Sequence, residues 1–502
     1  MNLKNISFFN IIHSLVRNIS FLYLLVSFFL ILVIDKSLEY SKKSILDFSN
    51  LFLFIFVICI LFIAVLMTRQ EKNYKNIIFK IGILSIIVFI VQVLVSYYMY
   101  FVVGWDVHVL VTNATQLANG GELSQGYFSI YPNNLFLVII FSWIMRIGKL
   151  LIPSNSYFFL VIVTSFIVNV SCFITIKVLK KLIENSKVIL FIYILMIPFI
   201  LLSPWITVPY SDAWGMIFPI LLIYVYLEKD MSYYLKIFLM ICICLIGYFV
   251  KPTVIIVMIA IVIIEFLNLD LKIQWKKILK CLFCCLCAVG MSFGIKNIMI
   301  SSTGFVQEKN LEMPLTHFMM MGLNPKSKGV YSRDDYNYSM SFLTKEERTE
   351  GNIKMIKERL SDYGVSGYMK LLICKNMSNY NDGTFSWEQE GGFHFPGSQP
   401  NTWTNQLLAN FYYANGDYYQ CYLVITQIIW MLVLVLSVLA YLCKRKECSV
   451  IILSIFGLSL FLLLFECRAR YLFLYLPLFM VLAGVGLNCL NQKANCYLLN
   501  AK

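Results

Sequence analysis

Charged residues are scarce in this sequence: lysine, arginine, aspartate and glutamate together make up 14% of its 502 residues. Soluble domains contain about 25% of these residues. Because 60% of the chain is apolar, too little polar surface remains to cover a fold that faces water on all sides. This balance excludes a disordered, collagen-like or disulfide-framed secreted chain, and it predicts an integral membrane protein.

Other signatures are missing as well. The chain has no glycine-rich loop of the kind that cradles phosphates, so nothing indicates a cytoplasmic nucleotide site. Most of its 15 cysteines lie inside apolar runs, where they are expected to pack rather than to form disulfides. The same holds for the cluster from Cys281 to Cys287, although its spacing resembles that of metal ligands. We therefore expect no cofactor; a divalent metal stays open, but nothing in the sequence indicates one.

Long apolar runs recur along most of the chain, and a run of about 17 to 25 residues can cross a bilayer. The first run ends at Asp35 and Lys36 without a small-residue cleavage site, so we expect it to be a retained span and not a signal peptide. The runs predict an all-α polytopic fold with about twelve spans, near 18–34, 50–68, 81–103, 157–178, 188–204, 213–228, 233–249, 252–269, 279–299, 419–443, 448–465 and 470–489.

The segment 131–151 is ambiguous, because it could be a thirteenth span or an amphipathic helix at the membrane surface. Lysine and arginine in short loops favour the cytoplasmic side. If 131–151 does not cross, most basic residues of the short loops lie in the cytoplasm; if it crosses, most lie outside. We therefore predict a cell-membrane protein with twelve spans, both termini in the cytoplasm, and 131–151 on the outer face.

This topology divides the chain into four parts. Residues 1–80 form an N-terminal transmembrane hairpin, and residues 81–299 form a transmembrane core with an outer loop at 104–156. Residues 300–417 form one α-rich, mixed extracellular subdomain, in which Thr344 and Glu347 predict a helix start through a capping box. Residues 418–502 supply the last transmembrane helices. The formal charge of +14 then reads as a topology signal and not as a nucleic-acid surface.

Ionisable residues gather at the predicted outer ends of the spans. Asp106 follows the third span, Asp212 follows the fifth, and Lys251 lies between two spans with almost no loop. The short segment after the eleventh span contributes Glu466, Arg468 and Arg470. Charge so close to a hydrocarbon core is costly and is a functional candidate by default, although charges at helix ends also serve as anchors.

These residue types suit one kind of chemistry. A carboxylate in a partly dry cleft suits general-base work on a hydroxyl group. Lysine and arginine at the interface suit a phosphate on a lipid, whose departure they can stabilise electrostatically without a metal. The pattern therefore predicts a site for a lipid-linked phosphate on the outer face.

The layout of these elements resembles the GT-C glycosyltransferase superfamily. The likeness rests on Asp106 in the first outer loop, Tyr131 and Pro132 opening the next helix, Asp212 in a Tyr-Ser-Asp element, and the Lys251-Pro252 pair. It is closest to bacterial relatives of the protein O-mannosyltransferases and the lipid A aminoarabinose transferase, and it covers roughly residues 80 to 270. Such enzymes transfer a sugar, with inversion, from a polyprenyl phosphate to an acceptor on the outer face.

The resemblance implies roles for these positions. Asp106 would deprotonate the acceptor hydroxyl, and Asp212 would be the second catalytic carboxylate. Lys251 would meet the lipid phosphate, with Tyr131 near it. Arg468 and Arg470, or alternatively Arg146 and Lys149, would supply the charge of a further arginine that the family places there. The sequence departs from the pattern where Val107 follows Asp106 in place of a second acid, and where SNSYFFLVIVTSF lacks the arginine that opens the next span. No Asp-x-Asp occurs in the first loop, which disfavours the metal-dependent type.

Four further residues are candidates for substrate contact: His108, Glu466, His317 and Trp105. Each also has a simpler interpretation. His108 could hydrogen-bond to a neighbour, and His317 could be a packed histidine in the outer subdomain. Trp105, together with Trp205 and Trp214, could belong to the aromatic belt at the outer interface.

The sequence thus predicts an inverting, polyprenyl-phosphate-dependent glycosyltransferase whose acceptor is a cell-surface glycan, lipid or protein. Its partners would be the lipid-linked sugar donor, that acceptor and membrane lipid, with no nucleic acid. Two alternatives stay open. An outer-face polysaccharide polymerase would use more basic residues in its outer loops. A transporter or flippase of lipid-linked saccharides would place charges in mid-span, where Lys296 is the single cation.

Overall fold

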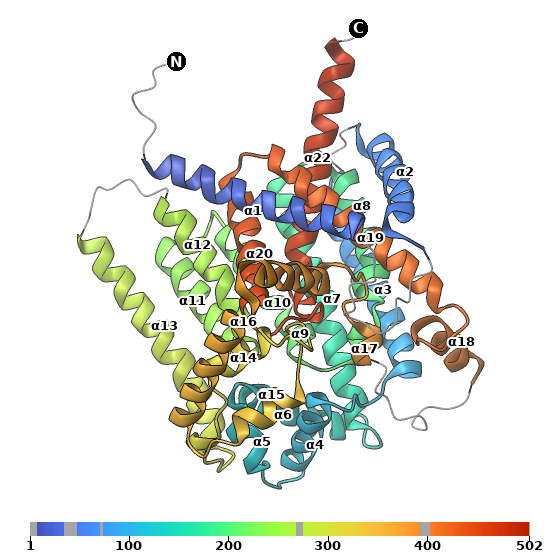
Figure 1. The fold of residues 1–502 in the computed structure, drawn as a ribbon. Coiled ribbons are helices and arrows are strands. Elements are labelled where there is room, and N and C mark those ends of the chain that lie inside the picture. Colours follow the sequence, from blue (N-terminus) through green and yellow to red (C-terminus); the bar gives the residue numbers. More distant parts are fainter. Residues whose placement is uncertain (1–7, 35–47, 71–73, 268–274, 392–401, 501–502) are drawn as a thin grey trace.

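The computed structural model describes residues 8–34, 48–70, 74–267, 275–391 and 402–500. In these residues the chain is helical, with turns and 3-10 segments between the helices and no strand. Figure 1 shows long helices running side by side in the upper part of the molecule and shorter helices gathered at its lower end. The all-α fold expected from the sequence is thus confirmed for the described residues.

The helices follow one another with short connections through most of the chain. The N-terminal half contains α1 (Phe8–Val33), α2 (Asn50–Thr68), α3 (Ile77–Met99), α4 (Asp106–Ala118), α5 (Gln125–Ile130), α6 (Leu135–Leu151), α7 (Ser156–Leu182), α8 (Ser186–Met196), α9 (Ser211–Gly215), α10 (Ile217–Tyr226) and α11 (Tyr233–Val250). The C-terminal half contains α12 (Ile255–Leu267), α13 (Trp275–Ser301), α14 (Leu315–Gly322), α15 (Arg333–Met340), α16 (Lys345–Tyr380), α17 (Trp387–Gly391), α18 (Trp403–Tyr412), α19 (Tyr419–Leu439), α20 (Lys446–Leu464), α21 (Arg470–Phe473) and α22 (Leu476–Asn500).

Nine helices in the described residues are long and apolar enough to cross a membrane, and eight of them coincide with predicted spans. Three more predicted spans, at 188–204, 213–228 and 252–269, correspond to shorter apolar helices; residues 268 and 269 lie outside the described part. The predicted span at 470–489 corresponds to α21 and the first half of α22. The count of twelve spans stays a prediction.

Prolines explain why some of these helices are short. Pro198 lies in the π-helical turn Ile197–Leu201 that ends α8, and Pro204 opens the 3-10 turn that follows. Proline has no backbone N–H to donate and clashes with the preceding turn, so an α-helix does not run through it undistorted. The chain therefore leaves the helix before the predicted end of this span, and the irregular segment carries residues toward Asp212.

The one long helix that does not coincide with a predicted span is Pro132–Leu151, the segment whose crossing of the membrane the sequence left open. Its first turn places Phe136 against Phe249, near the end of α11, with ring centroids 5.5 Å apart. Just beyond its last turn, Asn155 donates a hydrogen bond to the hydroxyl of Tyr100, which ends α3. Both ends of α6 therefore lie at the same end of the bundle, where Figure 1 shows α4, α5 and α6 together.

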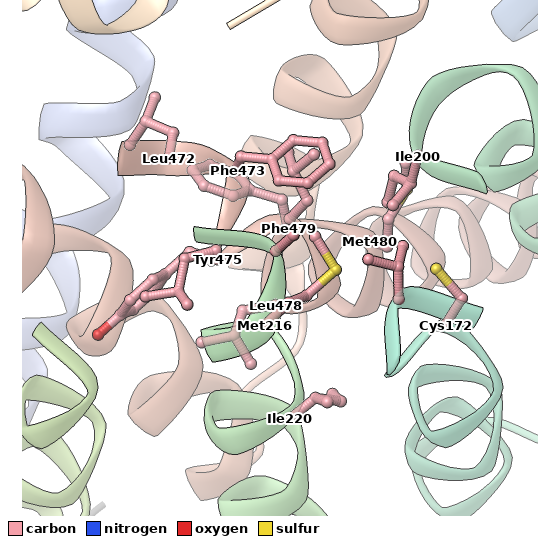
Figure 2. Close-up of a cluster of buried hydrophobic side chains, with 14 of the residues drawn as sticks. Cys172, Ile200, Met216, Ile220, Leu472, Phe473, Tyr475, Leu478, Phe479 and Met480 are labelled. Carbon is pink, nitrogen blue, oxygen red and sulfur yellow. The ribbon is translucent and has the colours of Figure 1, made fainter. Parts of the chain in front are cut away.

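The apolar core lies between α7, α19 and α22 and reaches the loops that follow α8 and α20. Figure 2 shows Phe473 of α21, Tyr475 of the turn that follows it, and Phe479 and Met480 of α22 packed near Ile200, Met216 and Ile220. Gly215 lets Leu474 approach the backbone of α9 closely, because a Cβ atom on residue 215 would lie 2.4 Å from Cδ1 of Leu474. The core thus fixes the short segments on either side of Asp212 and Arg470.

The region between α13 and α17, which the sequence predicts to be extracellular and which is called the outer region below, is helical and rich in buried polar groups. The capping box of Thr344 and Glu347 opens α16 as predicted. Arg348 is buried there and donates hydrogen bonds to four backbone carbonyls, those of Asn310, Glu312, Ser339 and Phe342.

The apolar residues Ile353, Ile356 and Leu360 lie along one face of α16, but this face does not form its core. Ile353 and Leu360 are exposed, while the buried face of this helix carries Arg348, Gly351 and Asn352. Hydrogen bonds of buried polar groups therefore contribute to holding this part of the subdomain together.

Candidate active site

Five short segments from distant parts of the sequence bring charged residues together at one end of the bundle. Asp106 is the first residue of α4, Asp212 lies in α9, and Lys251 ends α11 before the 3-10 turn Pro252–Val254. Arg470 opens α21, and Glu390 lies in α17. Because each residue sits at an element's end, its side chain reaches the cluster without crossing the apolar core.

Asp212 lies at the centre of this cluster. Its Oδ1 is 2.8 Å from Nζ of Lys251, and its Oδ2 is 3.0 Å from Nε of Arg470. The Asp212 side chain is 4% exposed and that of Arg470 is 6% exposed. These contacts are ion pairs and are not aligned as hydrogen bonds. Two cations therefore occupy both oxygens of one buried carboxylate.

The charged cluster continues from Arg470 through Glu390 to Arg468 and Glu466. The other carboxylate in contact with Arg470 is that of Glu390, with Nη1 of Arg470 2.5 Å from its Oε2. Arg468 then bridges two acids: its Nη1 is 2.6 Å from Oε1 of Glu390, and its Nε is 2.9 Å from Oε1 of Glu466. The chain of contacts thus alternates between cations and carboxylates from Lys251 to Glu466.

Aromatic rings surround the cations of the cluster. Cζ of Arg470 lies 4.0 Å from the ring centroid of Trp105 and 5.2 Å from that of Tyr210. Nζ of Lys251 lies 4.3 Å from the ring centroid of Tyr471. A cation held over aromatic faces keeps part of its electrostatic stabilisation when water is excluded. The rings therefore allow these cations to remain charged although little of their side chains is exposed.

Asp106 borders the cluster and is more accessible than Asp212. It is half-buried, and its Oδ2 accepts a hydrogen bond of 3.1 Å from the hydroxyl of Tyr210. Burial and the nearby charge of Asp106 raise the pKa of Tyr210 well above its usual value. The tyrosine therefore stays protonated and orients the carboxylate of Asp106 as a hydrogen-bond donor.

Tyr131 stands beside Asp106 on the turn that opens α6. Its ring centroid is 5.4 Å from that of Tyr127, whose hydroxyl accepts a hydrogen bond from Asn134. Burial, followed by the charge of Asp106, raises the pKa of Tyr131 above the usual range. The predicted position of Tyr131 near the charged residues agrees with this geometry.

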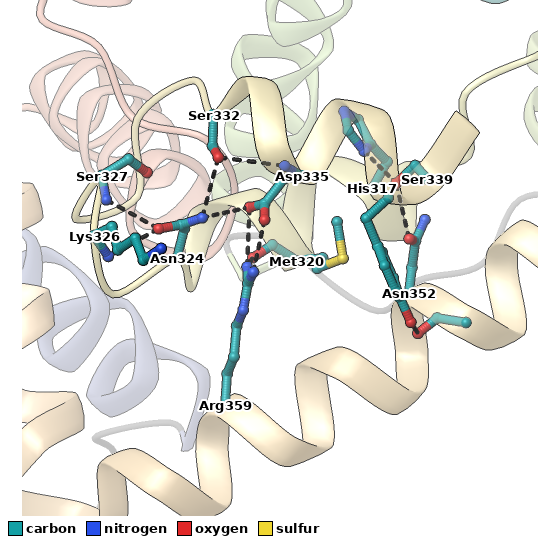
Figure 3. A network of polar contacts seen from close by, with 12 residues as sticks. His317, Met320, Asn324, Lys326, Ser327, Ser332, Asp335, Ser339, Asn352 and Arg359 are labelled. Carbon is teal, nitrogen blue, oxygen red and sulfur yellow. Dashed lines mark hydrogen bonds and ion pairs between the residues drawn. The ribbon is translucent and has the colours of Figure 1, made fainter. Parts of the chain in front are cut away.

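Two of the predicted contact residues lie apart from the chain of ion pairs. His108 is two residues beyond Asp106 and is exposed. His317 is buried in the outer region, where its Nδ1 pairs with the hydroxyl of Ser339 at 2.7 Å. Figure 3 shows His317 in a polar network with Ser339 and Asn352, beside the separate pair of Asp335 and Arg359. Burial lowers the pKa of His317 to about 4, and its contacts are those of a packed histidine.

The tryptophans divide between two environments. Trp105 contacts Arg470 in the cluster. Trp205 and Trp214 are buried inside the protein, where their indole N–H groups donate to the carbonyl of Thr384 and the hydroxyl of Thr164. Because their hydrogen bonds are satisfied internally, these two do not form the lipid-facing belt that the sequence suggested.

The sequence reasoning missed Glu390, which pairs with both arginines of the cluster. It lies in the stretch Phe385–Gly391, which lacks a clear helical or strand periodicity. One feature of the sequence could have indicated Glu390: a tryptophan, Trp387, and an acid, Glu390, lie next to glycines in an otherwise polar loop. Trp387 is buried and anchors this turn by donating to the carbonyl of Tyr412 at 2.7 Å.

The charge balance of the site is close to neutral. Three cations, Lys251, Arg468 and Arg470, face Asp212, Glu390 and Glu466, with Asp106 at the edge. Among the described residues no group of three or more histidine, cysteine, aspartate or glutamate side chains is arranged to hold a metal ion. The cluster is thus an ion-pair network with one additional, more accessible carboxylate.

The comparisons with known proteins identify a family for nearly the whole chain. A family described as "Conserved hypothetical integral membrane protein" matches residues 3–489, and the chain belongs to it. No curated protein and no solved structure matches the chain. The family confirms an integral membrane protein and leaves its chemistry to be argued from the site.

Proposed function

We propose that this integral membrane protein is an inverting glycosyltransferase of the GT-C type. It would move a sugar from a polyprenyl phosphate to a hydroxyl group of a glycan, lipid or protein at the outer membrane face. The observation that carries the proposal is the cluster of Lys251, Arg470 and Asp212 beside the accessible Asp106. A membrane-embedded bundle with such a cluster at one end suits a substrate whose lipid lies in the bilayer and whose phosphate lies at its edge.

The cations would receive the phosphate of the lipid donor. When the sugar leaves, a polyprenyl phosphodiester becomes a monoester and gains negative charge, and preorganised cations stabilise that charge. Lys251 and Arg468 are the more accessible of the three, with side chains 13% and 21% exposed. A phosphate that enters the site would take over contacts that carboxylates now make with these two residues.

Asp212 would then be a positioning residue and not a base. Its two oxygens are engaged by Lys251 and Arg470, so neither is directed at an acceptor. Glu390 holds Arg470 and Arg468 in the same way. Together these carboxylates keep several cations close in a dry place, where unpaired cations would repel one another and would be costly to desolvate.

Asp106 would act as the general base. Its Oδ2 is fixed by Tyr210, while the half-buried carboxylate stays open to a substrate. In the proposed step Asp106 takes the proton of the acceptor hydroxyl, whose oxygen forms a bond to the anomeric carbon as the bond from that carbon to the phosphate oxygen breaks. The polyprenyl phosphate leaves with the electron pair, and Trp105, Tyr131 and His108 would line the approach to Asp106.

The test compares Asp106→Asn with Glu122→Gln, an exposed carboxylate in the connection between α4 and α5. Wild type and both variants are reconstituted in nanodiscs with undecaprenyl-phosphate hexoses and a cell-envelope extract as acceptor, and released undecaprenyl phosphate is measured. General-base catalysis contributes about 10²–10⁴-fold, so Asp106→Asn should lose at least about 100-fold in turnover and Glu122→Gln should lose none.

Three outcomes would speak against the proposal. Turnover of Asp106→Asn close to wild type would remove the general-base assignment. Movement of intact lipid-linked saccharide between leaflets, without release of undecaprenyl phosphate, would favour a transporter. Undecaprenyl phosphate released together with a lengthened saccharide on the donor lipid would indicate a polymerase.

A further inference from the structure

A lysine that the charged cluster does not include is buried where α16 meets the bundle. Lys375 has no exposed surface, and its Nζ donates hydrogen bonds to the carbonyls of Gly322, at 2.9 Å, and Phe465, at 2.7 Å. Both acceptors are neutral backbone groups. Lysine is almost never fully buried unless it is paired with an acid, so this ammonium group needs a specific explanation.

The two carbonyls belong to the ends of two helices. Gly322 is the last residue of α14, and Phe465 is the C-cap residue of α20. The last carbonyls of a helix have no partner within that helix, and a cation near them is favourable. Lys375 therefore joins the outer region and a membrane helix by capping both at once.

The junction around Lys375 is closely packed. A Cβ atom on Gly322 would lie 2.7 Å from the carbonyl oxygen of Phe465, and one on Gly329 would lie 3.0 Å from the Lys375 side chain. The amide of Cys467 donates to the carbonyl of Gly329 at 2.9 Å. The loop after α20 is thus held against the outer region by several contacts, with the ammonium group at their centre.

The last turns of α16, which carry Lys375, are hydrogen-bonded to the helical bundle. Its neighbour Asn376 accepts hydrogen bonds from Tyr23 and Ser27 of α1, at 2.7 and 3.0 Å. The end of α16 therefore cannot shift freely relative to the membrane helices. Burial lowers the pKa of Lys375 to about 8, so at neutral pH the ammonium form predominates although its surroundings oppose the charge.

We propose that Lys375 is a positioning residue that fixes the loop 465–470 so that Arg468 and Arg470 face Glu390 and Asp212. This inference rests on the proposed function, because it assigns a task to the arginines of the same site. Arg468 and Arg470 lie within five residues of the capped carbonyl of Phe465. Release of that carbonyl would let the loop move away and would separate both arginines from their carboxylates.

The structural test uses Cys467, which is buried in the same loop. The full-length protein in nanodiscs is treated at pH 7 with a maleimide, and alkylation of each cysteine is followed by mass spectrometry. Lys375→Met should raise the alkylation rate of Cys467 by about tenfold or more through local opening. Lys370→Met, at an exposed position of the same helix, should leave it unchanged.

Cys172 separates local opening from global unfolding, because it is fully buried in α7. Protection of Cys467 in Lys375→Met would overturn the proposal. Simultaneous exposure of Cys172 and Cys467 would also overturn it, since Lys375 would then support the whole fold and not this loop. Lys375→Arg, which keeps the charge and its donors, should restore most of the protection of Cys467.

The functional readout is the donor KM in the turnover assay. A displaced phosphate site should raise the KM for the undecaprenyl-phosphate donor by about tenfold or more, with partial rescue in Lys375→Arg. An unchanged KM with an open loop would overturn the link to Arg468 and Arg470. If wild type shows no transfer at all, the proposed function fails, while alkylation of Cys467 still decides whether Lys375 fixes the loop.

Discussion

The two ends of the helical bundle carry ion pairs of different kinds. At one end, the partners in the pairs of Asp212 with Lys251 and of Arg470 with Glu390 are between 4% and 13% exposed. At the other end, the pairs of Lys181 with Glu228 and of Lys446 with Glu265 are between 21% and 45% exposed. Desolvating charges is costly, so the cluster at the first end holds charges in a place where they reduce the stability of the fold.

The cations at the second end have a simpler task. Arg445 donates to the carbonyl of Leu182, at the last turn of α7, and Arg17 donates to the carbonyl of Cys443, after α19. Cations at helix C-termini satisfy free carbonyls and remain partly in water. This is the behaviour of anchoring residues, and it matches the end that the positive-inside rule assigns to the cytoplasm.

The largest expected effect is the loss of stability when a buried ion pair is broken. It is measured against the same kind of substitution, a cation replaced by methionine, in an exposed ion pair. Arg470→Met leaves Asp212 and Glu390 with one cation fewer in a buried place, and loss of one partner of a buried pair costs about 3–5 kcal/mol. Lys446→Met, at the opposite end, should cost about 0–1 kcal/mol. The measurement is the free energy of unfolding from denaturation by SDS in mixed micelles.

Equal losses of stability for Arg470→Met and Lys446→Met would remove the distinction between the two ends. A double variant, Arg470→Met with Glu390→Gln, provides the internal check. It removes a cation and one of the acids that it neutralises, so it should be less destabilised than the sum of the two single changes.

The apolar helices and most of the charged site could be predicted from the sequence for physical reasons. A run of about twenty apolar residues has few alternatives to a spanning helix. Asp106, Asp212, Lys251 and Arg470 each follow or separate such runs, so their position at an outer helix end depends only on counting crossings. The structure brings these four residues together.

The residues that were missed depend on long-range contacts. Glu390 follows α16 by ten residues and reaches Arg470 only because α16 returns to the bundle. Lys375 looks like a surface lysine, although the apolar neighbours Leu371 and Ile373 hinted at burial. Tyr210 was read as part of a motif, and its hydrogen bond to Asp106 could not follow from spacing.

The second prediction concerns acid sensitivity at the end that carries the site. Burial lowers the pKa of His317 to about 4, below its value in an unfolded chain. Between about pH 6.5 and pH 4 the unfolded state therefore binds a proton that the folded state excludes, and stability falls as the pH falls through this window. The expected loss in the outer region is about 2–3 kcal/mol.

Hydrogen exchange of peptides from α14 and α15 at pH 7 and pH 4.5, corrected for intrinsic rates, measures this loss. Peptides from α19 and α20 serve as the reference for the other end. His317→Gln keeps a hydrogen-bonding group near Ser339 and removes the titration, so its α14 and α15 peptides should show a smaller change. Identical pH dependence in wild type and His317→Gln would exclude His317 as the cause.

The third prediction compares two lysines as ligands for a lipid phosphate. Lys251→Met should weaken binding of undecaprenyl phosphate in nanodiscs by about tenfold, which corresponds to about 1.4 kcal/mol. Lys181→Met removes a cation at the opposite end and should leave the affinity unchanged. Native mass spectrometry measures both affinities. An equal decrease in the two variants would show that the protein's overall positive charge, and not the cluster, binds the phosphate.

The smallest effect is expected from exchanging the charges of an exposed pair. In the variant Lys446→Glu with Glu265→Lys the two charges change places, and an exposed ion pair of this kind contributes about 0–1 kcal/mol in either order. The free energy of unfolding should therefore change little, and the remaining difference should shrink as salt screens the charges. The corresponding exchange at Lys251 and Asp212 should be far more disruptive, because Asp212 also neutralises Arg470 and a lysine in its place would put two cations together without water. If the second exchange changed the free energy of unfolding as little as the first, burial would not distinguish the ion pairs at the two ends. The cluster would then not be a site whose charges reduce the stability of the fold.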